Sequence, residues 1–283
     1  MKLKLSMIMM AVILFMAACS SDDDDLATNI AQDVAGTYKG YTVADFQYTS
    51  IPMTTPDQSI SITANEDGTS NIFYESDTWG KFTILNATVS LKNNVYTISG
   101  SGKTVMAMGS ADPKEYDCSI EGTISKDKQT VSFFFDIPVP MGGIEITFTQ
   151  GDAPANMVIA KVYTGSLNMT VMGSDQGTTD DVKVTIKAQD NGKSEVTLGK
   201  FGEGAMGFTE DIVITDVEIS LENGVYTIKK EGISAPSSTA NGPITVTGSM
   251  EGTIEDNNAN IVFTLRPGSM PMDLVCTFIG SSN

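Results

Sequence analysis

The chain has 283 residues, 41% of them hydrophobic, and a formal net charge of −18 with no histidine. This length allows two domains with proper cores, and so acidic a chain excludes binding to nucleic acid phosphates, which needs a basic patch. The lack of histidine also removes the commonest general base and the commonest transition-metal ligand.

The amino terminus has the pattern of a signal peptide over residues 1–18. Lys2 and Lys4 form a basic start, and Leu5 to Phe15 form an apolar core too short to span a bilayer comfortably. The letters from Met16 to Cys19 resemble the lipobox of bacterial lipoproteins, in which the cysteine is acylated and becomes the first mature residue. An ordinary cleavage site with an incidental cysteine is the alternative. We expect Cys19 to carry palmitate-type lipid and to anchor the protein in a lipid bilayer.

An acidic run follows the lipobox at Ser21, Asp22, Asp23, Asp24 and Asp25. Its plain interpretation is a solvated tether that covers residues 19–33. Its position directly after the cysteine resembles the export signal on surface lipoproteins of the Bacteroidota. The resemblance implies a lipid-anchored protein of the outer membrane that faces the cell exterior, with a periplasm-facing anchor as the alternative.

Residues 34–150 show period-two alternation of apolar and polar residues, with a turn signal every eight to twelve residues or so. This pattern is typical of an all-β sandwich or barrel. Inward positions are even-numbered at Phe82 and Ile84 but odd-numbered at Val89 and Leu91, which predicts a β-bulge near Asn86. About eight short strands follow one another without an amphipathic helix. Such meanders commonly close into an up-and-down antiparallel barrel.

The segment Val89-Ser-Leu-Lys-Asn-Asn-Val-Tyr-Thr-Ile98 recurs as Ile219-Ser-Leu-Glu-Asn-Gly-Val-Tyr-Thr-Ile228. The central Asn-Asn and Asn-Gly pairs suit the type I′ turn of a hairpin, which pairs Leu221 with Tyr226. Glu251-Gly-Thr-Ile254 likewise repeats Glu121-Gly-Thr-Ile124, and the parity switch recurs at Thr215-Asp216. Residues 159–280 are therefore predicted to form a second barrel of about eight strands, after a linker over residues 151–158.

The start Gly36-Thr-Tyr-Lys-Gly40, the Val-Tyr-Thr-Ile hairpins and the Glu-Gly-Thr-Ile strands resemble the calycin-like β-barrel domains of lipoproteins from gut Bacteroidota. The resemblance covers both repeats and implies two tandem calycin-like, that is lipocalin-like, barrels that could hold a ligand cavity. The resemblance does not imply any particular ligand for this chain. Fatty-acid-binding relatives hold a carboxylate with an arginine inside the barrel, whereas alternation after Leu265 points Arg266 outward.

No catalytic or metal-binding signature stands out in the sequence. A nucleophilic triad would have to work without histidine, and no Gly-x-Ser-x-Gly elbow is present. Acidic residues such as Glu66 and Asp190 lie in predicted turns, and Asp175, Asp180 and Asp181 lack calcium-loop spacing. We therefore predict a non-enzymatic protein with no cofactor and no metal.

The two cysteines beyond Cys19 face inward in different repeats. Alternation places Cys118 in the first barrel and Cys276 in the second, far beyond the limit of about 7 Å between Cα atoms for a disulfide. We predict that both are unpaired.

Two functional classes remain open. In one, a barrel captures a small apolar or glycan-like ligand, and the second barrel is the candidate because the first packs inward Phe133 and Phe135. Inner glycines such as Gly122 are expected to leave room for the ligand. The predicted cavity residues of the second barrel are Tyr163, Gly165, Met169, Tyr226, Gly248, Met250, Phe263 and Phe278. In the other class, the barrels are filled and the protein mediates surface interaction or adhesion by binding another surface protein through its outer faces or loops.

Overall fold

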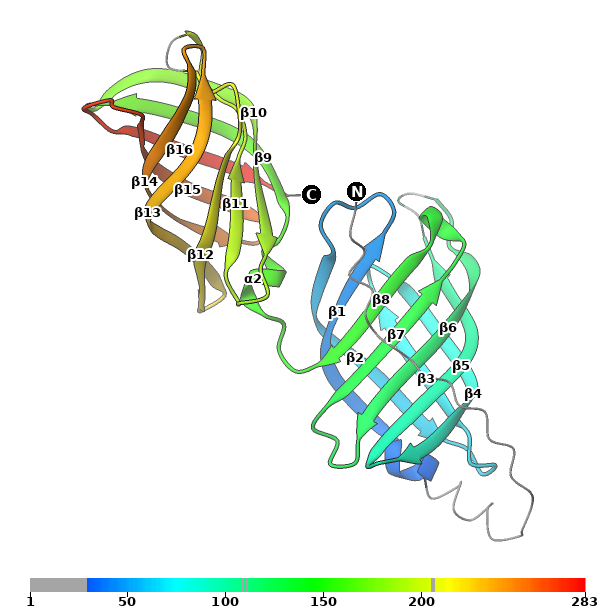
Figure 1. The fold of residues 1–283 in the computed structure, drawn as a ribbon. Coiled ribbons are helices and arrows are strands. Elements are labelled where there is room, and N and C mark those ends of the chain that lie inside the picture. The colour runs from blue at the N-terminus through cyan, green and yellow to red at the C-terminus, as the bar shows by residue number, and fades with distance from the viewer. Residues whose placement is uncertain (1–29, 108, 110, 205–206, 283) are drawn as a thin grey trace.

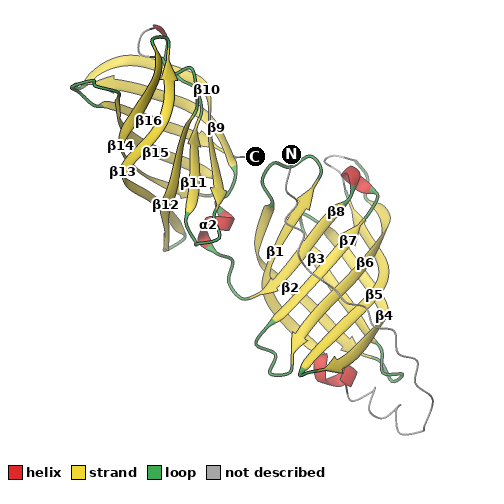
Figure 2. Ribbon diagram, viewed as in Figure 1, coloured by secondary structure: helices red, strands yellow, loops and turns green. Residues whose placement is uncertain are grey.

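The computed structural model describes residues 30–107, 109, 111–204 and 207–282. The signal peptide, Cys19 and the acidic run Ser21–Asp25 lie outside these ranges. The described chain forms two closed antiparallel barrels in tandem, each of eight strands in up-and-down order (Figures 1 and 2). The predicted fold class is confirmed.

The strands of barrel 1 follow the chain order, and β8 pairs with β1 to close the sheet. They are β1 (Gly36–Phe46), β2 (Met53–Ala64), β3 (Ser70–Ser76), β4 (Gly80–Lys92), β5 (Val95–Met106), β6 (Lys114–Ser125), β7 (Val131–Ile137) and β8 (Ile144–Gln150), with a 3-10 turn η1 (Pro140–Gly142) before β8.

Barrel 2 closes in the same way, by pairing β16 with β9. Its strands are β9 (Val162–Val171), β10 (Ser174–Ala188), β11 (Ser194–Leu198), β12 (Ile212–Glu222), β13 (Val225–Thr239), β14 (Gly242–Glu255), β15 (Asn258–Pro267) and β16 (Leu274–Ser281). A short helix, α2 (Ala155–Val158), precedes β9.

Each barrel has its own apolar core, because alternate side chains of every strand point inward. In barrel 1 the rings of Tyr74, Phe82 and Phe135 form a cluster with centroids 5.0–5.5 Å apart. In barrel 2 Phe263 and Phe278 are fully buried among aliphatic side chains. Two separate cores make two structural domains of one chain.

The local features predicted from the repeat are present. Asn86 has φ 56° where the β4–β5 register shifts, and Asp216 has φ 57° where the β11–β12 register shifts. At the hairpin turn Asn223 and Gly224 have φ 51° and 83°, as a type I′ turn requires, and Leu221 pairs with Tyr226. Both bulges and the predicted hairpin pairing are confirmed.

A short helix stands at one end of each barrel, which we call its base; the opposite end is its mouth. Residues 30–34 are helical before β1, and α2 occupies the same place before β9 (Figure 2). Tyr38 donates its hydroxyl hydrogen to the Val34 carbonyl at 2.8 Å, and Tyr163 does the same to Ile159 at 3.1 Å.

These helices lie at the ends of two predicted connecting segments. The sequence assigns residues 19–33 to a tether and 151–158 to a linker, but the ends of both segments form helices next to a barrel core. Val34, the first residue predicted for barrel 1, and Ile159, the first predicted for barrel 2, are each buried in the core of their own barrel. Helices of four or five residues are too short to show an apolar period, which is why alternation did not reveal them. No helix within the described ranges is long and apolar enough to cross a membrane.

Candidate binding sites

The predicted cavity residues of barrel 2 lie inside a packed core. Tyr163, Met169, Met250, Phe263 and Phe278 are 0–6% exposed and belong to one cluster of buried side chains. Tyr226 is partly buried and packs against the same cluster. Their inward direction agrees with alternation, but their side chains fill the barrel interior with one another.

The inner glycines do not leave the room that the sequence suggested. A Cβ atom on Gly165 would lie 2.1 Å from the Ile279 carbonyl oxygen, and one on Gly248 would lie 2.0 Å from that of Thr264. At Gly122 it would lie 2.1 Å from the ring of Phe133. These glycines let a neighbouring strand or ring approach the backbone closely, so the volume freed by the missing side chain is already occupied.

The interior of barrel 1 is the more polar of the two towards its mouth. The hydroxyls of Thr42 and Tyr74 lie 3.4 Å apart, and Tyr74 donates to Gln58 Oε1 at 2.9 Å. Burial raises the pKa of Tyr74. Thr104 Oγ1 and Trp79 Nε1 are buried and have no hydrogen-bond partner among the described residues. At the place of Thr104, barrel 2 has an alanine, Ala235, by equivalent strand pairing.

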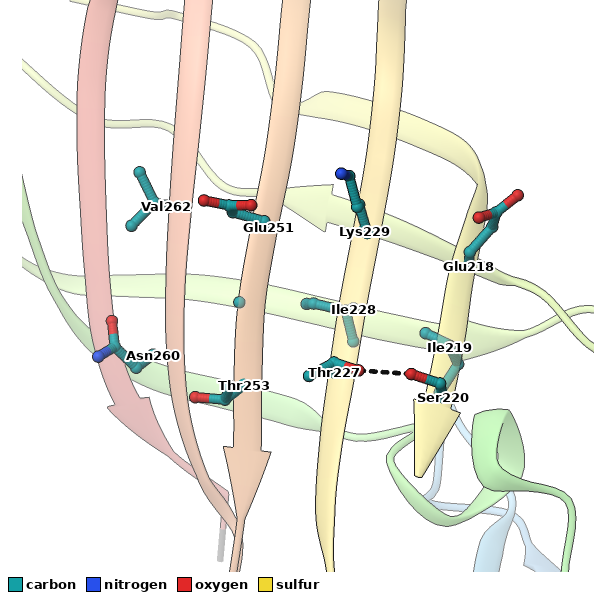
Figure 3. A pocket seen from close by; sticks show the side chains of 11 residues that line it. Glu218, Ile219, Ser220, Thr227, Ile228, Lys229, Glu251, Thr253, Asn260 and Val262 are labelled. Atoms are coloured by element: carbon teal, nitrogen blue, oxygen red, sulfur yellow. Dashed lines mark hydrogen bonds between the residues drawn. The ribbon is translucent and has the colours of Figure 1, made fainter. Parts of the chain in front are cut away.

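A groove of about 630 Å³ lies on the outer face of barrel 2, across β12, β13, β14 and β15 (Figure 3). Two neighbouring rows of outward side chains line it. One row, in strand order, is Glu218, Lys229, Glu251 and Val262, and the other is Ser220, Thr227, Thr253 and Asn260. Each row follows the register of the sheet, so every side chain stands beside its neighbour on the adjoining strand.

The groove is hollow because the sheet bends beside the charged row. The β12 bulge at Asp216 and a second register shift in β13, between Lys230 and Ile233, lie just beyond Glu218 and Lys229. Gly232, with φ 65°, supplies the left-handed backbone of the second irregularity. Bulges on adjacent strands increase the local twist and curve the outer face.

The charges of the groove are partly compensated within barrel 2. Lys229 Nζ lies 3.2 Å from a carboxylate oxygen of Glu231, and Glu218 pairs with Lys193 at 3.6 Å. Glu251 has no ion pair among the described residues. The hydroxyls of Ser220 and Thr227 lie 2.5 Å apart across the strands. The dashed line in Figure 3 marks this hydrogen bond.

The matching face of barrel 1 carries the same glutamate but not the other charges. At the positions of Glu218 and Lys229 it has Thr88 and Ser99, whose hydroxyls lie 3.0 Å apart. Glu121 stands where barrel 2 has Glu251. The groove is not predictable from one repeat alone, because outward polar residues look like an ordinary solvated surface. Comparison of the two repeats at these positions is the signal that could have found it.

The other predictions about chemistry concern single residues. Cys118 and Cys276 are buried and free, as predicted. Arg266 points outward, as predicted, and its guanidinium pairs with Asp273 at 2.7 Å. Asp175, Asp180 and Asp181 lie on β10. Asp175 accepts hydrogen bonds from Asn168 Nδ2 and the Gly177 backbone, which lower its pKa. Within the described ranges no group of three or more His, Cys, Asp or Glu residues could hold a metal ion.

Comparison with known proteins points to one family. The calycin-like beta-barrel domain matches the chain twice, at residues 34–151 and 159–281. A crystal structure from Bacteroides fragilis, described as a "putative outer membrane protein", is 28% identical with a TM-score of 0.72. The similarity covers 89% of this chain and 99% of that one, so it includes both barrels.

A protein of unknown function from Nostoc punctiforme, of the DUF3598 family, is 8% identical with a TM-score of 0.26, over 91% of this chain and 99% of that one. A likeness this low supports no argument. No curated protein matches the sequence. With two closed eight-stranded barrels, each covered by a family match, the chain belongs to the calycin-like β-barrel domain family.

Proposed function

We propose that the protein is a non-enzymatic surface lipoprotein whose second barrel binds a glycan-like ligand in its outer groove. The observation that carries the proposal is the contrast between the two sides of the β12–β15 wall. The inner side is a packed apolar core, whereas most side chains that line the outer groove can form hydrogen bonds, beside the apolar Val262 and parts of Ile219 and Ile228. A ligand rich in hydroxyl groups suits the outer side.

The groove offers both kinds of hydrogen-bonding group that sugar hydroxyls use. Glu251 and Glu218 accept hydrogen bonds, Lys229 donates them, and the row of Thr227, Thr253 and Asn260 does both. Hydrogen bonds to charged groups contribute about 1.5–3 kcal/mol each in favourable settings, but less on an exposed face. The four strands span roughly 14 Å at the usual inter-strand spacing. These dimensions favour an extended ligand laid across the strands.

The test uses the four-residue segment Glu-Gly-Thr-Ile, which occurs in β14 of barrel 2 and in β6 of barrel 1. Glu251→Ala and Thr253→Val change the groove, whereas Glu121→Ala and Thr123→Val make the same changes in barrel 1. We expect the wild-type protein to bind members of a glycan array and the groove variants to lose at least tenfold in affinity by calorimetry, while the barrel 1 variants match wild type. Equal losses in both pairs, or no glycan bound, would contradict the proposal. Cross-linking to a surface protein would then favour the interaction class.

The cellular location of the protein is part of the same proposal. The lipobox at Cys19 and the acidic run that follows support a lipid anchor and export to the cell exterior, and the similar Bacteroides protein is described as an outer membrane protein. We expect an alkyne palmitate analogue to label the wild-type protein and not Cys19→Ala. Protease added to intact cells should digest both barrels, and full protection would rule out exterior display.

A further inference from the structure

A second hollow, of about 570 Å³, lies where the two barrels meet. On the barrel 1 side it is lined by β1, β2 and the loop between them. On the barrel 2 side it is lined by α2 and by the turn from β10 to β11. Figure 1 shows α2 at the end of barrel 2 that is nearer to barrel 1. Pockets of 300–1,000 Å³ with mostly apolar walls are typical small-molecule sites, and domain junctions are a preferred place for them.

The barrel 1 wall contains a loop that barrel closure does not require. Barrel 2 joins its first two strands with Met172 and Gly173 alone, whereas barrel 1 uses residues 47–52. The Thr49 hydroxyl binds both the backbone N–H and the carbonyl of Ile51, which fixes the loop conformation. Ile51 and Pro52 then line the cleft, together with Val43 of β1. The extra residues therefore build an apolar wall.

The barrel 2 wall is held rigidly. Asn156 of α2 is buried, and its Nδ2 group donates to the carbonyls of Gln189 and Lys193 at 3.0 and 2.8 Å. Gln189 Oε1 in turn accepts from the Asp216 backbone at 3.2 Å. These bonds tie α2 to the β10–β11 turn, so Met157 of the helix and Ala160, two residues after it, face the cleft in a fixed position. A preformed apolar cleft costs little to order when a ligand binds.

The polar groups at the edge indicate the chemistry of the ligand. Lys187 of β10 lines the cleft, and its ammonium group forms no ion pair among the described residues. Asp190, in the neighbouring turn, also lines the cleft, and its carboxylate would repel an anionic ligand group placed beside it. We propose that this cleft binds a small amphipathic molecule, with a hydrocarbon body against Ile51, Pro52 and Met157 and an acidic head group beside Lys187.

The experiment uses the whole mature chain and two probes that share this chemistry. The aromatic sulfonate dye ANS reports binding by fluorescence, and decanoate competes with it at 0.15 M salt. Ser50→Trp places a bulky ring in the cleft, and Lys187→Glu reverses the charge. Lys183→Glu makes the same charge change on the same strand but outside the cleft, and it serves as the matched control. Circular dichroism verifies that each variant is folded.

We expect saturable ANS binding that decanoate displaces and that Ser50→Trp abolishes. Lys187→Glu should weaken decanoate by about fivefold, and Asp190→Asn should strengthen it, since exposed charge pairs contribute at most about 1 kcal/mol. Lys183→Glu should match wild type. ANS binding that survives Ser50→Trp would overturn the site. Decanol that competes as well as decanoate in both wild type and Lys187→Glu would overturn the acidic head group.

Discussion

Cys118 and Cys276 are chemically protected by the barrels that enclose them. Burial raises the pKa of Cys118 to about 11 and that of Cys276 to about 12. Because the thiolate is the reactive form, roughly one thiol in a thousand or fewer is reactive at pH 8. We expect N-ethylmaleimide to leave both residues unmodified in the native protein and to modify both after denaturation without reductant, as mass spectrometry would show. A Cys118–Cys276 linked peptide would contradict the two separate cores.

Thr104 carries a buried hydroxyl without a described partner, and this makes a second test at the scale of one residue. Replacing an unsatisfied buried hydroxyl by a methyl group removes its desolvation penalty, so Thr104→Val should stabilise barrel 1 by about 1 kcal/mol. Thr42→Val, which removes a neighbour of the Tyr74 hydroxyl, should instead destabilise it by a similar amount. Urea unfolding measures both. Destabilisation by Thr104→Val would show that this hydroxyl is bonded in solution.

At the scale of the element, the two copies of the repeated hairpin differ at one turn position, and exchanging the two residues tests the turn type. Asn94 has φ 62° in barrel 1, a left-handed conformation that glycine adopts more readily, and barrel 2 has Gly224 there. Asn94→Gly should stabilise barrel 1 by roughly 0.5 kcal/mol, and Gly224→Asn should destabilise barrel 2 by a similar amount. Thermal unfolding of the two variants should therefore shift in opposite directions. Shifts of the same sign would contradict the type I′ assignment.

The strands were predictable from sequence because their determinants are local. Alternation fixes which side chains point inward, and a parity switch at Asn86 or Asp216 marks a bulge without any knowledge of the partner strand. The hairpin pairing of Leu221 with Tyr226 follows from its turn residues. These signals extend over ten residues or fewer, so a single sequence suffices to read them.

The features that escaped prediction depend on contacts between distant residues. The space beside Gly122 is filled by Phe133 of the next strand, which the composition of the inner face cannot reveal. The groove of barrel 2 needs β12 to β15 to be in register and bent together. The cleft between the barrels is lined by Ile51 and by Met157, which are more than a hundred residues apart in the sequence. Residues 30–34 and α2 were missed because one helical turn carries no period.

At the scale of the whole molecule, the two closed barrels should be separable. Each has its own core and its own base helix, and α2 belongs with barrel 2. A protease site inserted after Ala153 should therefore allow cleavage without unfolding either half. Far-UV circular dichroism should be unchanged by the cut, and both fragments should remain resistant to further digestion. Loss of β-structure on cutting would show that the barrels depend on each other.

Under the proposed lipid anchor, the base helix at residues 30–34 would also determine how the molecule is oriented on a membrane surface. If Cys19 is acylated as proposed, ten residues separate it from Ile30, so eleven Cα–Cα steps span about 40 Å at most. The Tyr96 hydroxyl donates a hydrogen bond to Asp33 Oδ2 at 2.9 Å, so the helix that follows residues 20–29 is bonded directly to strand β5 of barrel 1. Under the proposed anchor, the base of barrel 1 would be confined near the lipid, and barrel 2 would be held only through barrel 1. Barrel 1 would then act as a spacer that holds barrel 2, with its outer groove, away from the membrane.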